Sequence, residues 1–519
     1  MKRRKFIQAG SMMSLPFFVG GTPFTAMGKN KLFDLIGDDN DKVLVLVQLQ
    51  GGNDGLSMIL PLDQYDNLQA VRSNVVVPNN SILKFSETNG FHPSMGSMID
   101  MWDSAKLGIV QGVAYPNQNR SHFRSTDIWH SASEPDEFLT TGWMGRYFDL
   151  NHSDYPEAYP SDDCPDPFAL TIGTIVSETC QGMQSNFSLA LTNPFDPGSV
   201  NIGELDVAPD NCYGRELTFV REVARQTNEY SEVIKDKADK GNNLSNKYPE
   251  DNALAQKLRT VARLISGGMQ TKIYVVQIGG FDLHSNQVVE GDTTAGRQAE
   301  ILKQLSDAIC AFQDDCVKLD IDKRVMGMTY SEFGRRIRSN LSNGTDHGTA
   351  APLFVFGSCV NPQIIGDNPV IDTQVDIAEG VPMQYDFRSV YSTLLMDWFN
   401  VSEEDVRSVL FKDFQHLPLI EGCASVSTIE VEDAASFALS VYPNPFDNYF
   451  NISFKSLGEH LRISLFNAMG AELQVVSSQH FSVGDHAFKI PTHNLSSGVY
   501  FVRVAGKENQ KTVRVVKAH

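Results

Sequence analysis

The sequence predicts an α/β fold, a three-layer sandwich around a mostly parallel central sheet, followed by a small antiparallel β-sandwich. Three apolar runs end in glycines or acids, as buried strands do where they leave a sheet: residues 42–56, 271–287 and 324–336. Long amphipathic helical patterns accompany them: residues 213–241, 252–268 and 295–319. Strands that alternate with helices favour a mostly parallel sheet, and ligands collect outside the carboxyl ends of its strands.

The N-terminal residues 1–28 predict an export signal, because the basic run KRRK precedes an apolar stretch too short to span a membrane. Arg3 and Arg4, followed by Phe6 and Ile7, resemble the twin-arginine consensus. This resemblance implies that the twin-arginine machinery exports the folded protein, so a metal could be loaded in the cytosol. A basic N-terminus without a targeting role is the alternative. No later segment reads as transmembrane.

A change in composition near Cys423 predicts a polar linker at residues 424–437 and a second domain at 438–519. The second domain alternates apolar and polar residues between turn signals, a pattern typical of an antiparallel β-sandwich. Its motifs YPNPF, LFNAMG and LSSGVYFVRV resemble the C-terminal sorting domain of type IX secretion. The resemblance implies export through the periplasm to the cell surface or extracellular space, with the type IX machinery as a partner. A generic adhesive or carbohydrate-binding sandwich is the alternative.

Residues 29–423 form the predicted main domain, in which residues 155–210, rich in Pro, Asp, Ser and Asn, read as an insertion or lid. The formal net charge of −20 argues against nucleic acid as a partner. Seven cysteines without a CxxC spacing argue against a zinc ribbon or a thioredoxin-like site. Disulfide formation after export is expected among Cys164, Cys180 and Cys212, whereas Cys359 reads as a packing residue.

Acidic and imidazole side chains follow the predicted strands. Asp54, among glycines at the end of the first strand, suits a metal, although a turn carboxylate that caps a helix is an equal alternative. Asp282 and His284 are one residue apart, so on an extended segment both can reach one cation. Asp346 and His347 lie in a glycine-bracketed loop and can turn toward neighbouring ions. An Asx-turn beside an exposed histidine is the alternative there.

The run NRSHFR suggests a reactive hydroxyl at the entrance to a helix, where unpaired backbone N–H groups favour an anion. We assign Ser121 as the candidate nucleophile with His122 beside it, and Arg120 and Arg124 as candidates to hold an oxyanion. The alternative is that Ser121 caps the helix and His122 packs.

The motif SEFGRR adds a third candidate group at a strand end. Glu332 is a candidate ligand or general base, and Arg335 is a candidate for binding an anionic substrate. An ion pair between the glutamate and an arginine is the alternative.

The ordered motifs GGNDGL, NRSHF, GGFDLHSNQ, SEFGRR and TDHGTAAPLFVFG resemble domain-of-unknown-function family 1501, which belongs with the alkaline phosphatase and sulfatase-like superfamily. The resemblance implies an alkaline phosphatase-like sandwich with one or two divalent ions beside a nucleophile. Motif by motif, it implies metal ligands at Asp54, Asp282, His284, Asp346 and His347. Zinc, calcium, magnesium and manganese all remain open. No sulfatase-type Cys-x-Pro-x-Arg motif is present.

These observations lead to the hypothesis of an exported, metal-dependent hydrolase of phosphate or sulfate esters, whose substrate is an anionic ester or glycan. The alternative is a non-catalytic metal-containing surface protein that binds anionic glycans or serves as a structural partner.

Overall fold

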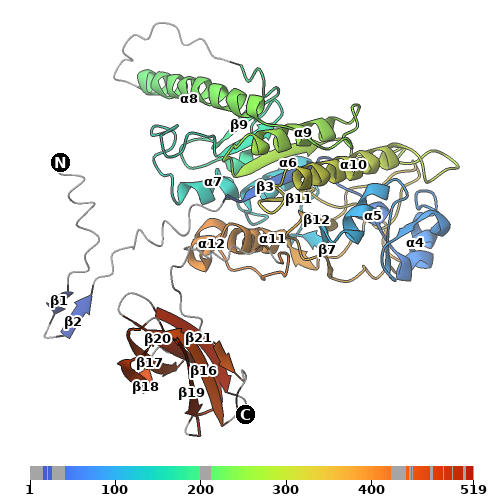
Figure 1. Ribbon diagram of the computed structural model, residues 1–519. Helices are drawn as coiled ribbons and strands as arrows, with labels where there is room; N and C mark the ends of the chain where they lie inside the picture. Colours follow the sequence, from blue (N-terminus) through green and yellow to red (C-terminus); the bar gives the residue numbers. More distant parts are fainter. Residues whose placement is uncertain are drawn as a thin grey trace. The chain divides into compact units, whose positions relative to one another are not determined.

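The computed structural model describes residues 16–19, 22–25, 41–198, 212–421 and 423, and in the C-terminal region 440–442, 446, 448–456, 458–467, 472–482, 484–493, 495–506 and 510–517. The chain divides into two compact units, Met1–Val426 and Ser427–His519 (Figure 1). The predicted signal, apart from the paired strands β1 (Pro16–Val19) and β2 (Thr22–Thr25), lies outside the described residues, as does the predicted linker.

A nine-stranded, mostly parallel sheet forms the centre of the first unit, with the strand order β13-β7-β12-β11-β3-β10-β8-β9 and β14 beside β7. Only β12 runs antiparallel to its neighbours in this sheet. The strands are β3 (Val43–Leu49), β7 (Leu107–Ala114), β8 (Ala169–Ile172), β9 (Ser188–Leu191), β10 (Ile273–Ile278), β11 (Val325–Tyr330), β12 (Ala351–Gly357), β13 (Ile364–Ile365) and β14 (Tyr385–Asp386).

Helices cover both faces of the sheet, so the unit is a three-layer α/β sandwich, as predicted (Figure 1). Alternate residues of β3 enter two separate cores, since successive side chains of a strand point to opposite faces. The first core includes α5 (Gly96–Asp103), α8 (Cys212–Lys240), α9 (Ala253–Ser266) and α10 (Arg297–Lys318). The second includes α6 (His122–Ser131), α7 (Trp143–Asp149), α11 (Phe387–Thr393), the π-helix η4 (Leu394–Trp398) and α12 (Glu403–Leu410).

Short elements complete this unit between β3 and β9. They include a small sheet in the order β4-β6-β5, which follows the first strand of the central sheet. The elements are α3 (Gly55–Met58), β4 (Ile59–Pro61), η1 (Leu62–Gln64), α4 (Tyr65–Arg72), η2 (Asn79–Ser81), β5 (Leu83–Lys84), β6 (Asn89–Phe91) and η3 (Glu178–Cys180).

Two details differ from the sequence predictions. Residues 155–210 are not only an insertion or lid, because β8 and β9 within them extend the central sheet, parallel to β10. Among the described residues, a disulfide joins Cys359 to Cys423, and Cys180 is a buried free thiol. The expectation that Cys359 only packs was therefore wrong: its partner is 64 residues away in sequence, and the fold brings the two together.

The second unit consists of two antiparallel sheets, in the orders β15-β16-β19 and β18-β17-β20-β21. Apolar side chains from both sheets form one core, so this unit is the antiparallel sandwich that the sequence predicts. Its strands are β15 (Ser440–Tyr442), β16 (Tyr449–Ser456), β17 (His460–Asn467), β18 (Glu472–His480), β19 (Gly484–Pro491), β20 (Gly498–Ala505) and β21 (Gln510–Lys517).

Candidate metal centre

The topology of the central sheet brings four loops to one edge. β3, β10 and β11 are parallel, so the segments that follow them leave at the same edge. β7 has the same direction, because it is antiparallel to β12 and β12 is antiparallel to β11. The segment before β12 arrives at this edge for the same reason. The carboxyl edge of the sheet therefore collects polar residues from distant parts of the chain.

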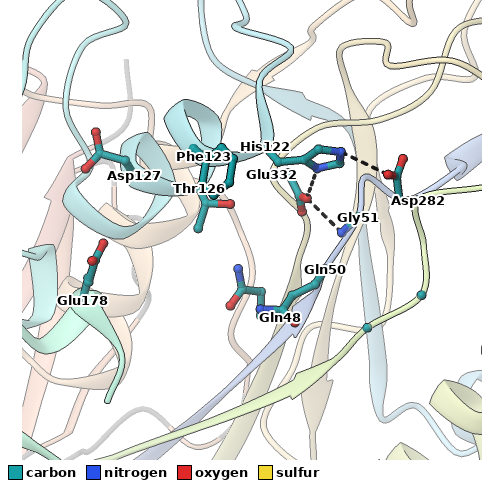
Figure 2. Close-up of a pocket in the computed structure, with 12 residues that line it drawn as sticks. Gln48, Gln50, Gly51, His122, Phe123, Thr126, Asp127, Glu178, Asp282 and Glu332 are labelled. Carbon is teal, nitrogen blue, oxygen red and sulfur yellow. Dashed lines mark hydrogen bonds and ion pairs between the residues drawn. The ribbon is translucent and has the colours of Figure 1, made fainter. Parts of the chain in front are cut away.

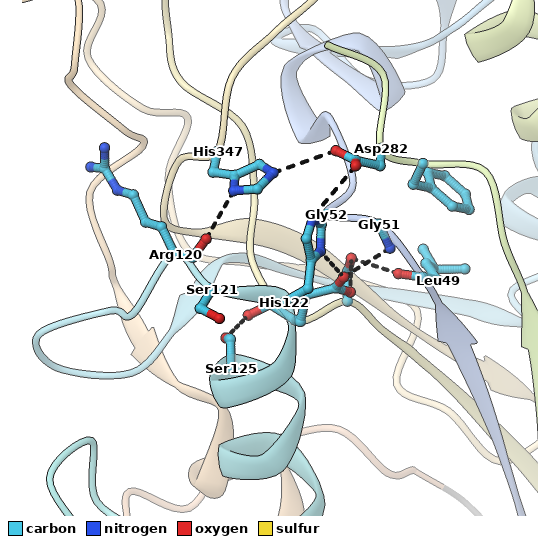
Figure 3. Close-up of polar contacts among 12 residues, drawn as sticks. Leu49, Gly51, Gly52, Arg120, Ser121, His122, Ser125, Asp282 and His347 are labelled. Carbon is cyan, nitrogen blue, oxygen red and sulfur yellow. Dashed lines mark hydrogen bonds and ion pairs between the residues drawn. The ribbon is translucent and has the colours of Figure 1, made fainter.

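Three imidazoles and one carboxylate converge at this edge: His122, His284, His347 and Asp282. The Oδ1 atom of Asp282 lies 3.1 Å from Nε2 of His284 and 3.4 Å from Nε2 of His347. The Nε2 atoms of His284 and His347 are 2.9 Å apart. Nε2 of His122 lies 3.6 Å from Oδ2 of Asp282 and, although buried, has no hydrogen-bond partner among the described residues (Figure 3). We call these four residues the histidine cluster.

An acceptor behind each imidazole sets its orientation. Nδ1–H of His122 donates to Glu332 Oε1 at 2.7 Å, and Nδ1–H of His284 donates to Asp346 Oδ1 at 3.0 Å. Nδ1–H of His347 donates to the backbone carbonyl of Arg120 at 2.8 Å (Figure 3). In all three rings, the lone pair of the neutral imidazole is therefore on Nε2, directed into the cluster. A second acceptor of this kind orients the ring in most metal-binding histidines.

The cluster has the donor set and the spacing of a metal site. Four acceptor atoms that face one another repel unless a proton or a cation lies between them. A tetrahedral zinc ion with bonds of about 2.0–2.1 Å sets its ligand atoms about 3.3 Å apart, and the four separations given above run from 2.9 to 3.6 Å. His122, Asp282 and His347 meet the geometric requirement for one shared ion. Three imidazoles and a carboxylate suit zinc better than magnesium or calcium, which prefer oxygen ligands.

Arg335 holds the strand ends together beneath the cluster. Its buried guanidinium donates to the carbonyls of Gly52 and Thr345 at 2.8 Å each and to Asp282 Oδ1 at 2.8 Å. Burial raises the pKa of Asp282, but the hydrogen bond and charge of Arg335 and the nearby histidines lower it, so the net pKa lies below the usual value. Arg335 thus keeps Asp282 ionised. Its donors have protein partners, which leaves it poorly suited to the predicted role of binding substrate.

Glu332 is buried where β11 ends, and it links two loops of the site. Its Oε1 atom accepts a hydrogen bond from the N–H of Gly51 at 2.8 Å as well as the bond from His122. Gly51 has φ +121°, and a side chain there would overlap the backbone of Asp282, so this close approach requires glycine. Glu332 therefore accepts the Nδ1–H of His122 and fixes the orientation of its imidazole ring.

Asp346 has the same role for His284 that Glu332 has for His122, because it accepts the Nδ1–H of the ring. Burial raises the pKa of Asp346, but hydrogen bonds from His284 and Asn340 and the charge of Arg336 lower it, so the net pKa lies below the usual value. Burial lowers the pKa of His347. The lowered pKa of Asp346 favours its ionised carboxylate, and the lowered pKa of His347 favours its neutral imidazole. A metal site requires both of these protonation states.

The side chains of three residues assigned from sequence are engaged by partners away from the cluster. Asp54 is buried and forms an ion pair with Arg72 at 3.0 Å, so its carboxylate is already neutralised. The guanidinium of Arg120 donates to the carbonyl of Ala378 at 2.8 Å, and only its backbone serves the cluster. Arg124 pairs with Asp127. These contacts argue against the predicted roles of Asp54, Arg120 and Arg124.

Ser121 is the N-cap residue of α6, but its side chain makes no capping hydrogen bond. Its hydroxyl is exposed and immediately precedes His122 in the chain. The alternative that Ser121 serves only to cap the helix is therefore not supported by its contacts. The hydroxyl remains a candidate nucleophile.

A cavity of about 490 Å³ opens beside the cluster, with His122 and Asp282 in its wall (Figure 2). Apart from Glu332, the other side chains that line it were not predicted from the sequence. Two of them carried a signal: Gln48 and Gln50 are the polar residues at the end of the otherwise apolar run VLVLVQLQ. The remaining lining side chains include Phe123, Thr126, Asp127, Glu178 and Glu332.

The fold and the site together define an α/β protein with a histidine-rich candidate metal centre and a separate antiparallel sandwich. The chain belongs to the family described as "Protein of unknown function (DUF1501)", which matches residues 79–389. Residues 440–518 match the secretion system C-terminal sorting domain, so the protein is exported to the cell surface or extracellular space. Both resemblances inferred from the sequence are confirmed, whereas the twin-arginine signal stays a prediction. Among the described helices, none has the length and apolar character of a membrane span.

Similar solved structures include a protein in the alkaline phosphatase superfamily from Vibrio parahaemolyticus, with 10% identity over 81% of this chain and 76% of that chain and a TM-score of 0.30. The PsFucS1 sulfatase from Pseudoalteromonas sp. has 8% identity over 88% and 85%, with a TM-score of 0.32. PorZ, a surface component of the type IX secretion system of Porphyromonas gingivalis, has 18% identity over only 20% of this chain and 14% of its own, with a TM-score of 0.13. No curated protein sequence matches the chain. At these TM-scores, the similarities do not bear on the chemistry of the site.

Proposed function

We propose that the first unit is a metal-dependent hydrolase of phosphate or sulfate esters that acts after export. The observation that carries this proposal is the convergence of three Nε2 atoms and one carboxylate at the carboxyl edge of the sheet, with an acceptor behind every imidazole. The cavity beside the cluster gives an ester access to it.

The proposed ligands are His122, His284, His347 and Asp282, and the donor set favours zinc among the divalent ions. Bound there, the ion would supply Lewis acidity and lower the pKa of a hydroxyl or water. This assignment moves His122 from a catalytic role to a ligand role. Glu332 and Asp346 become positioning residues that fix the tautomers of His122 and His284.

Side chains around the cluster supply the nucleophile and maintain the proposed ligands. Ser121 offers an exposed hydroxyl with no capping bond, one residue from a proposed ligand, so we retain it as the nucleophile. Arg335 maintains the ionised Asp282 and the spacing of the strand ends. Among the residues that the structure describes, no lysine or arginine lines the cavity.

A second candidate is a non-catalytic, metal-containing surface protein. The observation in its favour is the donor count, because four protein ligands fill a tetrahedral shell, as in structural zinc sites, whereas catalytic zinc keeps a position open. This candidate predicts bound metal without turnover. Among the described residues, no lysine or arginine lines the cavity, which argues against the anionic glycan first expected as the ligand of this protein.

The test is elemental analysis of the full chain together with an ester panel of p-nitrophenyl phosphate, bis(p-nitrophenyl) phosphate and p-nitrophenyl sulfate. We expect about one equivalent of metal in the wild type and in His416→Ala, an exposed histidine paired with Asp397, and a loss of both metal and turnover in His347→Ala. Metal without turnover would favour the second candidate. Equal metal content in all three proteins, or none in any, would refute the assignment of the cluster.

A further inference from the structure

The cavity beside the histidine cluster has a wall of hydrogen-bonding and acidic groups. Besides His122 and Asp282, its side chains include Gln48, Gln50, Phe123, Thr126, Asp127 and Glu178 (Figure 2). No lysine or arginine is among the described residues that line it. A leaving group that carries additional negative charge would therefore meet carboxylates rather than cations.

One carboxylate in this wall, that of Glu178, is accessible to a ligand. Asp127 is neutralised by Arg124, whose guanidinium also donates to the carbonyls of Glu134 and Pro135. Glu178 differs, because its side chain is 77% exposed and its ion-pair partner among the described residues, His130, is 3.9 Å away. That distance is too long for a hydrogen bond. His130 lowers the pKa of Glu178, which keeps the carboxylate ionised. Glu178 can therefore accept hydrogen bonds from a cationic group in the cavity.

Two other features of the wall suit a polyhydroxylated ring. Gln48 is only 2% exposed, and its Oε1 accepts a bond from Gln277 at 3.0 Å, while its Nε2 has no hydrogen-bond partner among the described residues. Because Gln48 lines the cavity, its amide donor is accessible to a ligand there. Phe123, at the first turn of α6, is 90% exposed and presents an apolar ring at the cavity. Such a ring can pack on the apolar face of a sugar.

We propose that the cavity binds the leaving group of the ester, and that this group is an amino sugar with a free ammonium, which Glu178 recognises. This assignment rests on the proposed function for its location beside the reacting ester. Gln48 then donates to a ring hydroxyl, and Phe123 covers one face of the ring. Sugars that carry a carboxylate are disfavoured by the same acidic wall.

The experiment measures equilibrium binding of glucosamine, glucose and glucuronate to the zinc-loaded full chain, at a pH where the amine of glucosamine is protonated. We expect glucosamine to bind about two- to fivefold more tightly than glucose, as for a largely exposed ion pair, and glucuronate to bind most weakly. Glu178→Gln removes the difference between glucosamine and glucose. The matched control Glu87→Gln, at another exposed glutamate, retains it.

Equal affinity of glucosamine and glucose for the wild type, no sugar binding, or an unchanged preference in Glu178→Gln would overturn the inference. Because the measurement requires no turnover, its outcome is separate from that of the ester panel. Sugar preference without ester hydrolysis would refute the hydrolase while supporting the assignment of the cavity. Hydrolysis of p-nitrophenyl esters without sugar preference would support the hydrolase and refute the assignment of the cavity.

Discussion

Removing the carboxylate of Asp54 is expected to destabilise the first unit strongly. This carboxylate is 3% exposed and bonds to Arg72, itself 1% exposed, at 3.0 and 3.1 Å. It also accepts bonds from Ser57 at 2.6 Å and from Gln287 at 2.7 Å. Asp54→Ala leaves a buried guanidinium without its counter-ion, which typically costs about 3–5 kcal/mol.

The assay is urea denaturation of the full chain, with tryptophan fluorescence to follow the first unit. The double variant Asp54→Ala, Arg72→Met is the control, because it removes the uncompensated charge and should recover most of the lost free energy. A loss below about 1 kcal/mol in the single variant, or no recovery in the double variant, would refute the reasoning.

Acid provides a second test of the same ion pair. Burial raises the pKa of Asp54, but Arg72 and the hydrogen bonds from Ser57 and Gln287 lower it, so the net pKa lies below the usual value. A depressed pKa contributes stability above the unfolded-state pKa of about 3.9, and this stability is lost as the pH falls through the lower folded-state pKa. The stability of the double variant should therefore fall less between neutral and acidic pH.

Three further predictions concern the cluster and the disulfide. Glu332→Gln keeps the shape of the residue but weakens its hold on His122, so metal affinity should fall about 10- to 100-fold in chelator competition; unchanged affinity would contradict this role. Gly344→Ala should reduce metal occupancy, since its new side chain would overlap the backbone at the cluster, whereas Gly96→Ala has free space and should not. Cys359→Ser opens a link across 64 residues and should lower the unfolding free energy by up to about 4 kcal/mol; an unchanged melting temperature would exclude this contribution.

The strands and helices that position the site could be predicted from sequence. The apolar runs ending in GGNDGL, GGFDLH and SEF appear as β3, β10 and β11, because a strand buried on both faces needs a continuous apolar sequence. The amphipathic patterns appear as α8, α9 and α10 for the corresponding reason. The strand β8 and the edge strand β9 were misread as parts of a lid because each is only four residues long.

The pairing of charges could not be predicted in the same way. Asp54 and Asp282 both follow an apolar strand and two glycines, yet one meets Arg72 in the interior and the other faces the histidines. Likewise, Arg335 and Arg336 are adjacent in sequence but bind different acids, Asp282 and Asp346. A local motif does not encode which distant side chain arrives beside it.

The sequence by itself determined the α/β class, the sorting domain and the strand-end location of the reactive groups, because periodicity, glycines and terminal motifs are local properties of the chain. Only the tertiary structure decided that His122 joins His284, His347 and Asp282, and that Glu332 lies behind His122. The physical reason is the crossover topology of the sheet. It brings residues more than 200 positions apart to one edge, where distances of about 3 Å decide which atoms share a cation and which form ion pairs.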